Sequence, residues 1–137
     1  SACLVGSEMC IRDRMVTGGK ISESAYLCLK LAWIYRGEIQ EAKANGAAEE
    51  RISMYEKYEK EYLEDAYRGF KQARETEYPP IAGMDENTIT YLLTSIGIHC
   101  GKIDEARRYG SALLISRTAS MKLKNKTRDV LETIKKN

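Results

Sequence analysis

Cys100 and His99 are the neighbouring residues whose types best suit nucleophilic chemistry, because a histidine can take the proton of a thiol. Their side chains would have to meet, whereas neighbours on a helix point about 100° apart. The chain holds 1 histidine, so a histidine-based triad or metal cluster would need other residue types. We therefore interpret Cys100 and Cys28 as small buried residues, and we expect neither an enzyme nor a cofactor.

Thr17-Gly18-Gly19-Lys20 is similar to the end of a phosphate-binding loop. That loop requires a glycine where Arg14 stands and a hydroxyl residue where Ile21 stands, so this reading is excluded. The 4 cysteines contain no Cys-x-x-Cys pair, which is the spacing of zinc ribbons and thioredoxin-like sites. Neither a metal site nor a disulfide scaffold is predicted.

Trp33, Tyr35 and Arg36 form a possible ligand-facing cluster, since an arginine beside aromatic rings can grip a carboxylate while it stacks. The alternative is core packing with a cation near a helix end. Further along, Met84, Asp85 and Glu86 are candidates to contact a protein or peptide partner. Their alternative is a helix cap at Asp85 with a hydrophobic staple across it.

Basic residues are in excess near the carboxyl end, where they could attract phosphates. The basic residues are Arg117, Lys122, Lys124, Lys126, Arg128, Lys135 and Lys136, against Asp129 and Glu132. A solvated helix end is the alternative, and no interleaved aromatic residues support stacking on single strands. A nucleic-acid-associated module that uses this basic helix is therefore the weaker functional hypothesis.

Length and composition favour one soluble globular domain. The chain has 137 residues, of which 43% are hydrophobic and 31% charged, with net charge +2. No apolar run is long enough to cross a membrane, and no secretory signal is visible, so we expect a cytoplasmic protein. Residues 1–19 are predicted to be a disordered or artefactual terminus, because residues 1–14 resemble translated sequencing-adapter read-through. The helical domain is expected over residues 20–137.

Hydrophobic periodicity predicts helices that would position these residues. The first begins at the cap Ser22 and ends near Arg36-Gly37, where glycine can close a helix. We expect it to be broadly buried, on two adjoining stripes: Ala25, Cys28, Leu29 and Ala32, then Leu27, Leu31 and Ile34.

A long second helix is predicted from about residue 47 to residue 77, where Tyr78-Pro79-Pro80 must stop it. Its apolar face contains Tyr55, Tyr58, Tyr62, Leu63, Ala66, Phe70 and Ala73. Three further helices follow: one capped by Asp85 and ended by Gly101, one capped by Asp104, and one from about Ser120. The predicted class is all-α, with about five helices.

Two segments place small and large apolar residues as a tetratricopeptide repeat does. The clearer copy contains Leu93, Gly101, Ile103, Glu105, Ala106 and Tyr109; the other contains Leu31, Ala32 and Tyr35, then Ala66, Phe70 and Ala73 after a long insertion. We therefore expect tetratricopeptide-like antiparallel hairpins. Such packing leaves a concave surface for a protein or peptide, which here would include Tyr55, Tyr58 and Tyr62.

Three stretches together resemble the carboxy-terminal half of the DUF2225 family of bacterial proteins. They are residues 26–36 (Tyr-Leu-Cys-Leu-Lys-Leu-Ala-Trp-Ile-Tyr-Arg), residues 80–86 (Pro-Ile-Ala-Gly-Met-Asp-Glu) and Tyr91-Leu92. The resemblance covers roughly residues 20 to 130 and implies a helical fold, but no mechanism, because the members of this family have no known function. It also implies a cysteine-rich, zinc-ribbon-like segment ahead of this half, whose paired cysteines are not in this sequence.

Overall fold

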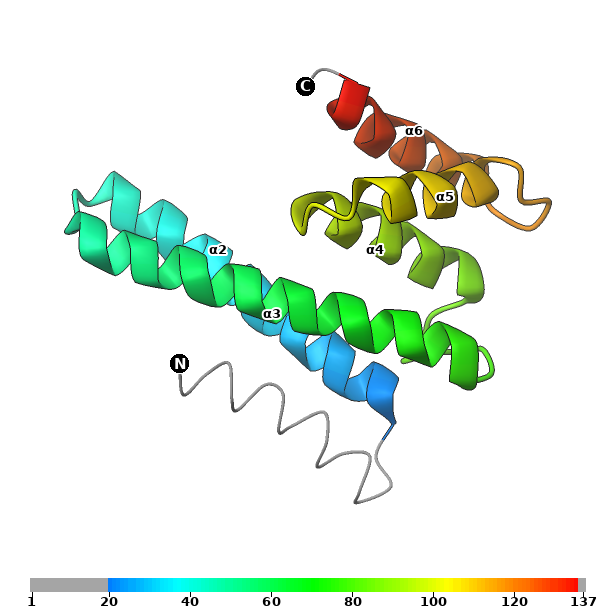
Figure 1. The fold of residues 1–137 in the computed structure, drawn as a ribbon, viewed down its shortest axis with the longest axis horizontal. Coiled ribbons are helices and arrows are strands. Elements are labelled where there is room, and N and C mark those ends of the chain that lie inside the picture. Colours follow the sequence, from blue (N-terminus) through cyan, green and yellow to red (C-terminus); the bar gives the residue numbers. More distant parts are fainter. Residues whose placement is uncertain (1–19, 136–137) are drawn as a thin grey trace. The chain divides into compact units, whose positions relative to one another are not determined.

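The computed structural model describes residues 20–135 of the 137-residue chain (Figure 1). Within that range the chain forms five helices: α2 (Ile21–Ala44), α3 (Glu49–Thr76), α4 (Glu86–His99), α5 (Ile103–Leu114) and α6 (Met121–Lys135). The one β-type pairing among these residues is an isolated bridge between Ile81 and Met84. The predicted all-α class is confirmed. The predicted disordered or artefactual terminus, residues 1–19, lies outside the described residues.

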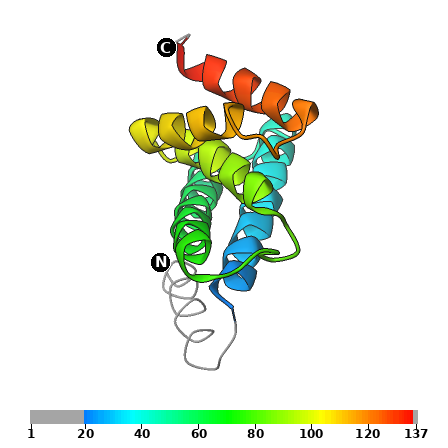
Figure 2. The same cartoon turned by 90° about the vertical axis from the view of Figure 1, so that its right-hand side faces the viewer.

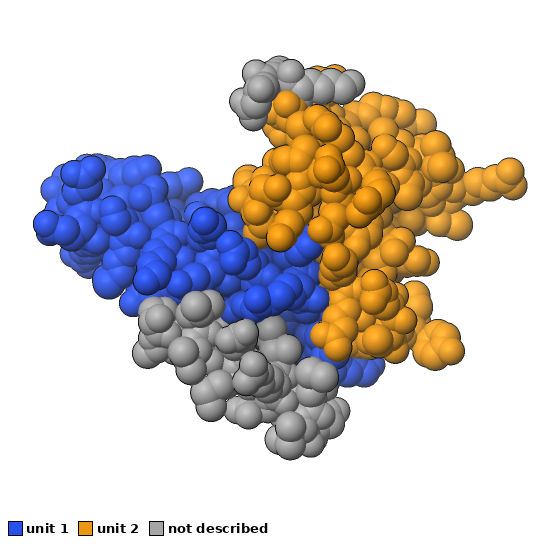
Figure 3. Space-filling model, viewed as in Figure 1, with its two compact units in different colours: residues 1–69 blue, residues 70–137 orange. Residues whose placement is uncertain are grey.

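The chain divides into two compact units, Ser1–Gly69 and Phe70–Asn137, shown in blue and orange in Figure 3. The division falls inside α3, so residues 49–69 of that helix belong to the first unit and residues 70–76 to the second. The expectation of one helical domain over residues 20–137 stays a prediction.

The first unit is a helical hairpin in which α2 and residues 49–69 of α3 run antiparallel (Figures 1 and 2). The buried side of α2 carries mostly small residues, among them Ala25, Cys28 and Ala32. Gly69 of α3 has no side chain at the point where it meets Ala25, which allows the two backbones to approach closely. Small residues on both helices therefore determine how near the two arms of the hairpin lie.

Two expectations for α2 are wrong. Lys20, rather than Ser22, occupies the N-cap position, and Ser22 lies buried inside the helix. The helix also continues past Gly37 to Ala44, because Ile39 and Ala42 extend its buried face. It ends where Asn45 occupies the C-cap and Gly46 adopts a left-handed conformation with φ 67°, which glycine reaches without steric cost.

The second unit is built from α4, α5 and α6, together with residues 70–76 of α3. Helices α4 and α5 form an antiparallel hairpin, and α6 packs against both (Figures 1 and 2). Ile89 and Leu93 of α4 and Leu113 of α5 are almost completely buried. At the contact of α5 with α6, Gly110 faces the side chain of Leu131.

Most of the helix ends predicted from capping residues and glycines are confirmed in this unit. Asp85 caps α4 as predicted, and Gly101, with φ 78°, follows its last turn. α6 begins directly after Ser120, whose Oγ accepts a hydrogen bond of 3.1 Å from the backbone N–H of Leu123. The expected cap at Asp104 is wrong: Lys102 stands at the N-cap of α5, and Asp104 lies in the first turn. A carboxylate in that turn still interacts favourably with the helix dipole.

The four residues central to the predicted hairpins occupy inward positions. Ala66, Phe70 and Ala106 have no exposed surface, and Tyr109 is half-buried. The segment between residues 49 and 76 is one continuous helix. Tetratricopeptide-like packing itself stays a prediction.

Candidate functional site

Trp33, Tyr35 and Arg36 do not form one cluster. The Arg36 Nε lies 2.9 Å from Oε2 of Glu59 on α3, and the Tyr35 ring packs against tyrosines of the same helix. Trp33 is 48% exposed instead, so the alternative of core packing is wrong for this residue. Of the three residues, Arg36 and Tyr35 contact α3, and Trp33 is 48% exposed.

The predicted tyrosines of α3 surround Tyr35 of α2. The ring centroid of Tyr35 lies 5.9 Å from that of Tyr55, 5.3 Å from Tyr58 and 5.8 Å from Tyr62, and the Tyr62 ring is stacked on it at 12°. Tyr62 is buried, and Tyr55 and Tyr58 are half-buried. Each aromatic pair contributes about 0.5–1.5 kcal/mol beyond area burial, so these rings hold the hairpin arms together. Their role in partner binding stays a prediction.

The loop before α4 is occupied by local contacts. Met84 and Ile81 exchange two backbone hydrogen bonds, of 2.8 and 2.9 Å. Oδ1 of Asp85 accepts a hydrogen bond of 2.8 Å from the backbone N–H of Thr88, which confirms the helix cap. Hydrogen bonds from the Thr88 hydroxyl and from its backbone N–H lower the pKa of Asp85.

Glu86, the third candidate in this loop, faces Arg74 near the carboxyl end of α3. Oε1 of Glu86 lies 3.6 Å from Nη2 of Arg74, whose Nε donates a hydrogen bond of 3.2 Å to the Thr90 hydroxyl. The Arg74 guanidinium also lies 5.5 Å from the ring centroid of Tyr109, a distance at which cation and ring attract. Three neighbours therefore fix the position of this arginine.

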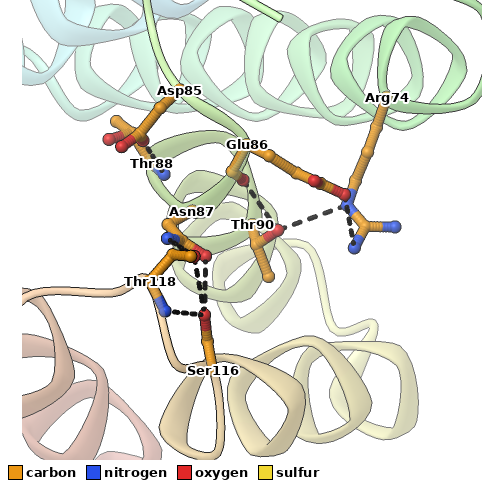
Figure 4. A network of polar contacts seen from close by, with 8 residues as sticks. All are labelled: Arg74, Asp85, Glu86, Asn87, Thr88, Thr90, Ser116 and Thr118. Atoms are coloured by element: carbon orange, nitrogen blue, oxygen red, sulfur yellow. Dashed lines mark hydrogen bonds and ion pairs between the residues drawn. The ribbon is translucent and has the colours of Figure 1, made fainter.

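A second set of polar contacts ties the first turn of α4 to the connection between α5 and α6 (Figure 4). Asn87 donates to the Thr118 hydroxyl at 2.8 Å and accepts from Ser116 Oγ at 3.2 Å. Ser116 Oγ in turn accepts from the backbone N–H of Thr118 at 3.2 Å. These groups border a hollow of about 200 Å³ with Arg74, Glu86 and Thr90. The arrangement positions a turn and contains neither cysteine nor histidine.

Residues 20–135 contain no arrangement typical of a cysteine–histidine nucleophile or of a metal site. Cys28 is buried as predicted, whereas Cys100 is half-buried and His99 exposed. No group of three or more histidine, cysteine, aspartate or glutamate side chains in this range is placed to hold a metal ion. None of the helices in this range has the length and apolar character needed to cross a membrane.

The solvent-exposed side of α2 carries Leu27, Ile34 and the half-buried Leu31, and also Trp33, which lies about 100° around the helix from Ile34. We call this exposed side the outer face of α2. Leu27 is 42% exposed and Ile34 57% exposed, so the expectation of a broadly buried helix is wrong for this stripe. Leu27, Leu31 and Ile34 recur at i, i+4 and i+7, the spacing that puts them on one side of a helix. This spacing is visible in the sequence, but apolar periodicity alone does not distinguish a buried stripe from an exposed one.

A second feature not predicted is a hollow of about 420 Å³ between α5 and α6. It is lined by Arg107, Ser111 and Leu114 of α5 and by Arg128, Leu131 and Glu132 of α6. The spacing of these residues puts each set on one helix face. Tertiary packing decides which face of α5 meets which face of α6. The sequence pattern of each helix alone therefore does not predict this hollow.

Comparison with known proteins identifies one family whose model matches this chain. A family model described as "Uncharacterized protein conserved in bacteria (DUF2225)" matches residues 8–134. This match begins inside the segment 1–14 that resembles adapter read-through, and earlier than the expected start near residue 20. Neither a curated protein nor a solved structure gave a match. Because the family model covers nearly the whole chain, the chain belongs to the DUF2225 family.

Proposed function

We propose that this chain is a helical interaction module of tetratricopeptide-like type, and that the outer face of α2 binds an apolar surface of a protein partner. The observation that carries the proposal is the exposure of three large apolar side chains on one helix: Leu27 at 42%, Trp33 at 48% and Ile34 at 57%. Leu27 and Ile34 lie on one side of the helix and Trp33 about 100° around it from Ile34. Exposed large apolar side chains gathered on one element mark interaction surfaces more often than scattered ones do.

The composition of this face suits a protein interface. Tryptophan is enriched among the residues that contribute most to binding, because it buries a large area with few rotatable bonds. Polar residues accompany the apolar side chains, as they do in protein interfaces. Lys30 lies between Trp33 and Ile34 around the helix, with its Nζ 4.8 Å from the ring centroid of Tyr26, and Glu38 is exposed one turn beyond Ile34.

The other predicted binding residues support this choice by their contacts. Arg36 pairs with Glu59, Asp85 caps α4 and Glu86 faces Arg74. A ligand that recruited those groups would have to replace existing interactions. Covering the outer face of α2 instead removes apolar surface from water, which contributes about 25 cal/mol for each Å² buried.

Site-specific photocrosslinking in the native host cell tests this proposal. A photoreactive amino acid at position 33 or 34 of the full chain is expected to trap one and the same protein. The control is the same amino acid at Tyr78, which is 93% exposed and lies outside α2. Crosslinks that are identical at all three positions, or absent at 33 and 34, would contradict the proposal.

The trapped protein is then purified and its affinity for variants is measured by calorimetry. Ile34→Glu is expected to weaken binding at least tenfold, because a carboxylate would lose its water in an apolar interface. Ser53→Glu, at an exposed position of α3, introduces the same charge elsewhere and should leave affinity unchanged. Equal affinities for the two variants would show that the outer face of α2 is not the binding surface.

A further inference from the structure

The hollow between α5 and α6 lies beside one close contact between these helices, and Leu131 takes part in both. A Cβ at Gly110 would lie 2.8 Å from Cδ1 and 2.9 Å from Cδ2 of Leu131. Glycine therefore lets Leu131 sit directly against the backbone of α5. Beside this contact the two helix surfaces leave about 420 Å³ open, a size within the range of pockets that bind small molecules or side chains.

The lining of this hollow combines an apolar floor with two unneutralised cations. Leu114 and Leu131 are half-buried, whereas Arg107 and Arg128 are exposed. Nη1 of Arg128 donates a hydrogen bond of 2.8 Å to Asn125 Oδ1, which orients this guanidinium. Within the described part of the chain, neither arginine forms an ion pair with a carboxylate.

The charge around the hollow selects the class of ligand. Residues 102–135 contain nine basic and four acidic side chains, so the surroundings attract an anion. A guanidinium binds a carboxylate through two parallel hydrogen bonds, and the leucines beside it offer an apolar contact. Glu132, also in the lining, repels anions and disfavours a continuous run of phosphates.

We propose that this hollow binds an acidic peptide segment of a protein partner, in which an aliphatic side chain stands beside a carboxylate. Arg107 and Arg128 bind the carboxylate, and the aliphatic side chain packs on Leu114 and Leu131. Protein is favoured over nucleic acid because no aromatic side chain lines the hollow for base stacking. This site is independent of the outer face of α2, so either proposal can fail alone.

Fluorescence anisotropy with defined probes tests the proposal on the full chain. The probe is a short labelled peptide in which glutamate and leucine alternate. One control peptide carries glutamine for glutamate, a second carries serine for leucine, and labelled oligothymidylate represents nucleic acid. Only the first peptide is expected to bind, since the hollow offers both a cationic and an apolar contact.

Matched variants identify the residues responsible. Arg107→Ala and Arg128→Ala should each weaken binding of the peptide about tenfold, as expected for a lost charge-assisted hydrogen-bonded pair. Arg108→Ala and Lys126→Ala remove cations that are exposed but outside the lining, and they should change affinity less than twofold. Glu132→Gln removes the opposing charge and should strengthen binding.

The outcomes separate the alternatives. Equal losses for the lining and control variants, or tighter binding of oligothymidylate than of the peptide, would identify a diffuse basic surface and overturn the proposal. Equal binding of all three peptides, or of none, would overturn it as well. Circular dichroism of each variant should match the wild type, because all the substituted side chains are exposed.

Discussion

Gly69 provides a direct test of how closely the hairpin arms of the first unit pack. A Cβ at this position would lie 2.6 Å from Cβ and 3.3 Å from Cα of Ala25. Both Ala25 atoms are fixed to the backbone of α2 and cannot rotate away, so α2 and α3 would have to separate. Gly37 of α2 is the matched control, because a Cβ there would meet nothing within 4 Å.

The two substitutions should change the free energy of unfolding in opposite directions. Replacing a helical glycine by alanine stabilises a helix by about 0.5–1 kcal/mol, and Gly37→Ala should show this gain. Gly69→Ala has the same gain but loses about 1–3 kcal/mol to overpacking. The loss belongs in the upper half of that range because the obstacle is rigid, so we expect a net destabilisation of about 1–2.5 kcal/mol.

Urea unfolding followed by far-UV circular dichroism measures both changes as shifts of the midpoint at constant slope. Adding Ala25→Gly to Gly69→Ala removes the clashing methyl group, so the two substitutions should be strongly non-additive. If Gly69→Ala were as stabilising as Gly37→Ala, the close approach of the two helices would be refuted. Purely additive effects of the double variant would refute it as well.

Two further predictions concern charged groups of the second unit. Asp85→Ala should cost about 1 kcal/mol in urea unfolding because the cap is lost. Since the folded pKa of Asp85 lies below its usual value of 3.8, the stability that this carboxylate contributes is complete above pH 3.8 and is lost as pH falls through the folded value. Asp85→Asn keeps an acceptor and should remove this part of the pH dependence; an unchanged profile would contradict the cap. Lys71 Nζ lies 2.7 Å from Oε1 of Glu105, whose hydrogen bond raises the pKa of Lys71. Its contribution is therefore complete below 10.5 and lost as pH rises through the folded value. Because the pair is partly exposed, Glu105→Gln should cost less than about 1 kcal/mol, and this cost should shrink in salt; a cost that does not respond to salt would contradict the assignment.

Helix ends were predictable where the signal acts within a few residues. The carboxylate of Asp85 reaches an N–H of the next turn, and Gly101 supplies the left-handed residue after α4. Gly37 does not end α2, because glycine ends a helix only where the backbone turns, and Ile39 and Ala42 continue the buried face beyond it. Counting that face further would have located the end at Gly46.

The candidate sites depended on pairings that local patterns do not contain. The sequence indicates Arg36 as an interacting cation, but its partner Glu59 is 23 residues away on another helix. Tyr35 and Trp33 are close in sequence, yet residues two apart on a helix point to nearly opposite sides. The hollow beside Gly110 depends on which face of α6 packs against α5, and no local sequence pattern contains that information. Residue types were therefore predictable from sequence, whereas their neighbours were not.

The chain contains 1 tryptophan, and its half-exposed position gives the protein an intrinsic optical reporter. Indole emission responds to the polarity of its surroundings, and Trp33 already contacts water in the folded chain. Unfolding should therefore shift the emission only slightly. A partner that covers the outer face of α2 should shift it to shorter wavelength, so fluorescence can detect docking without a label and with little interference from denaturation.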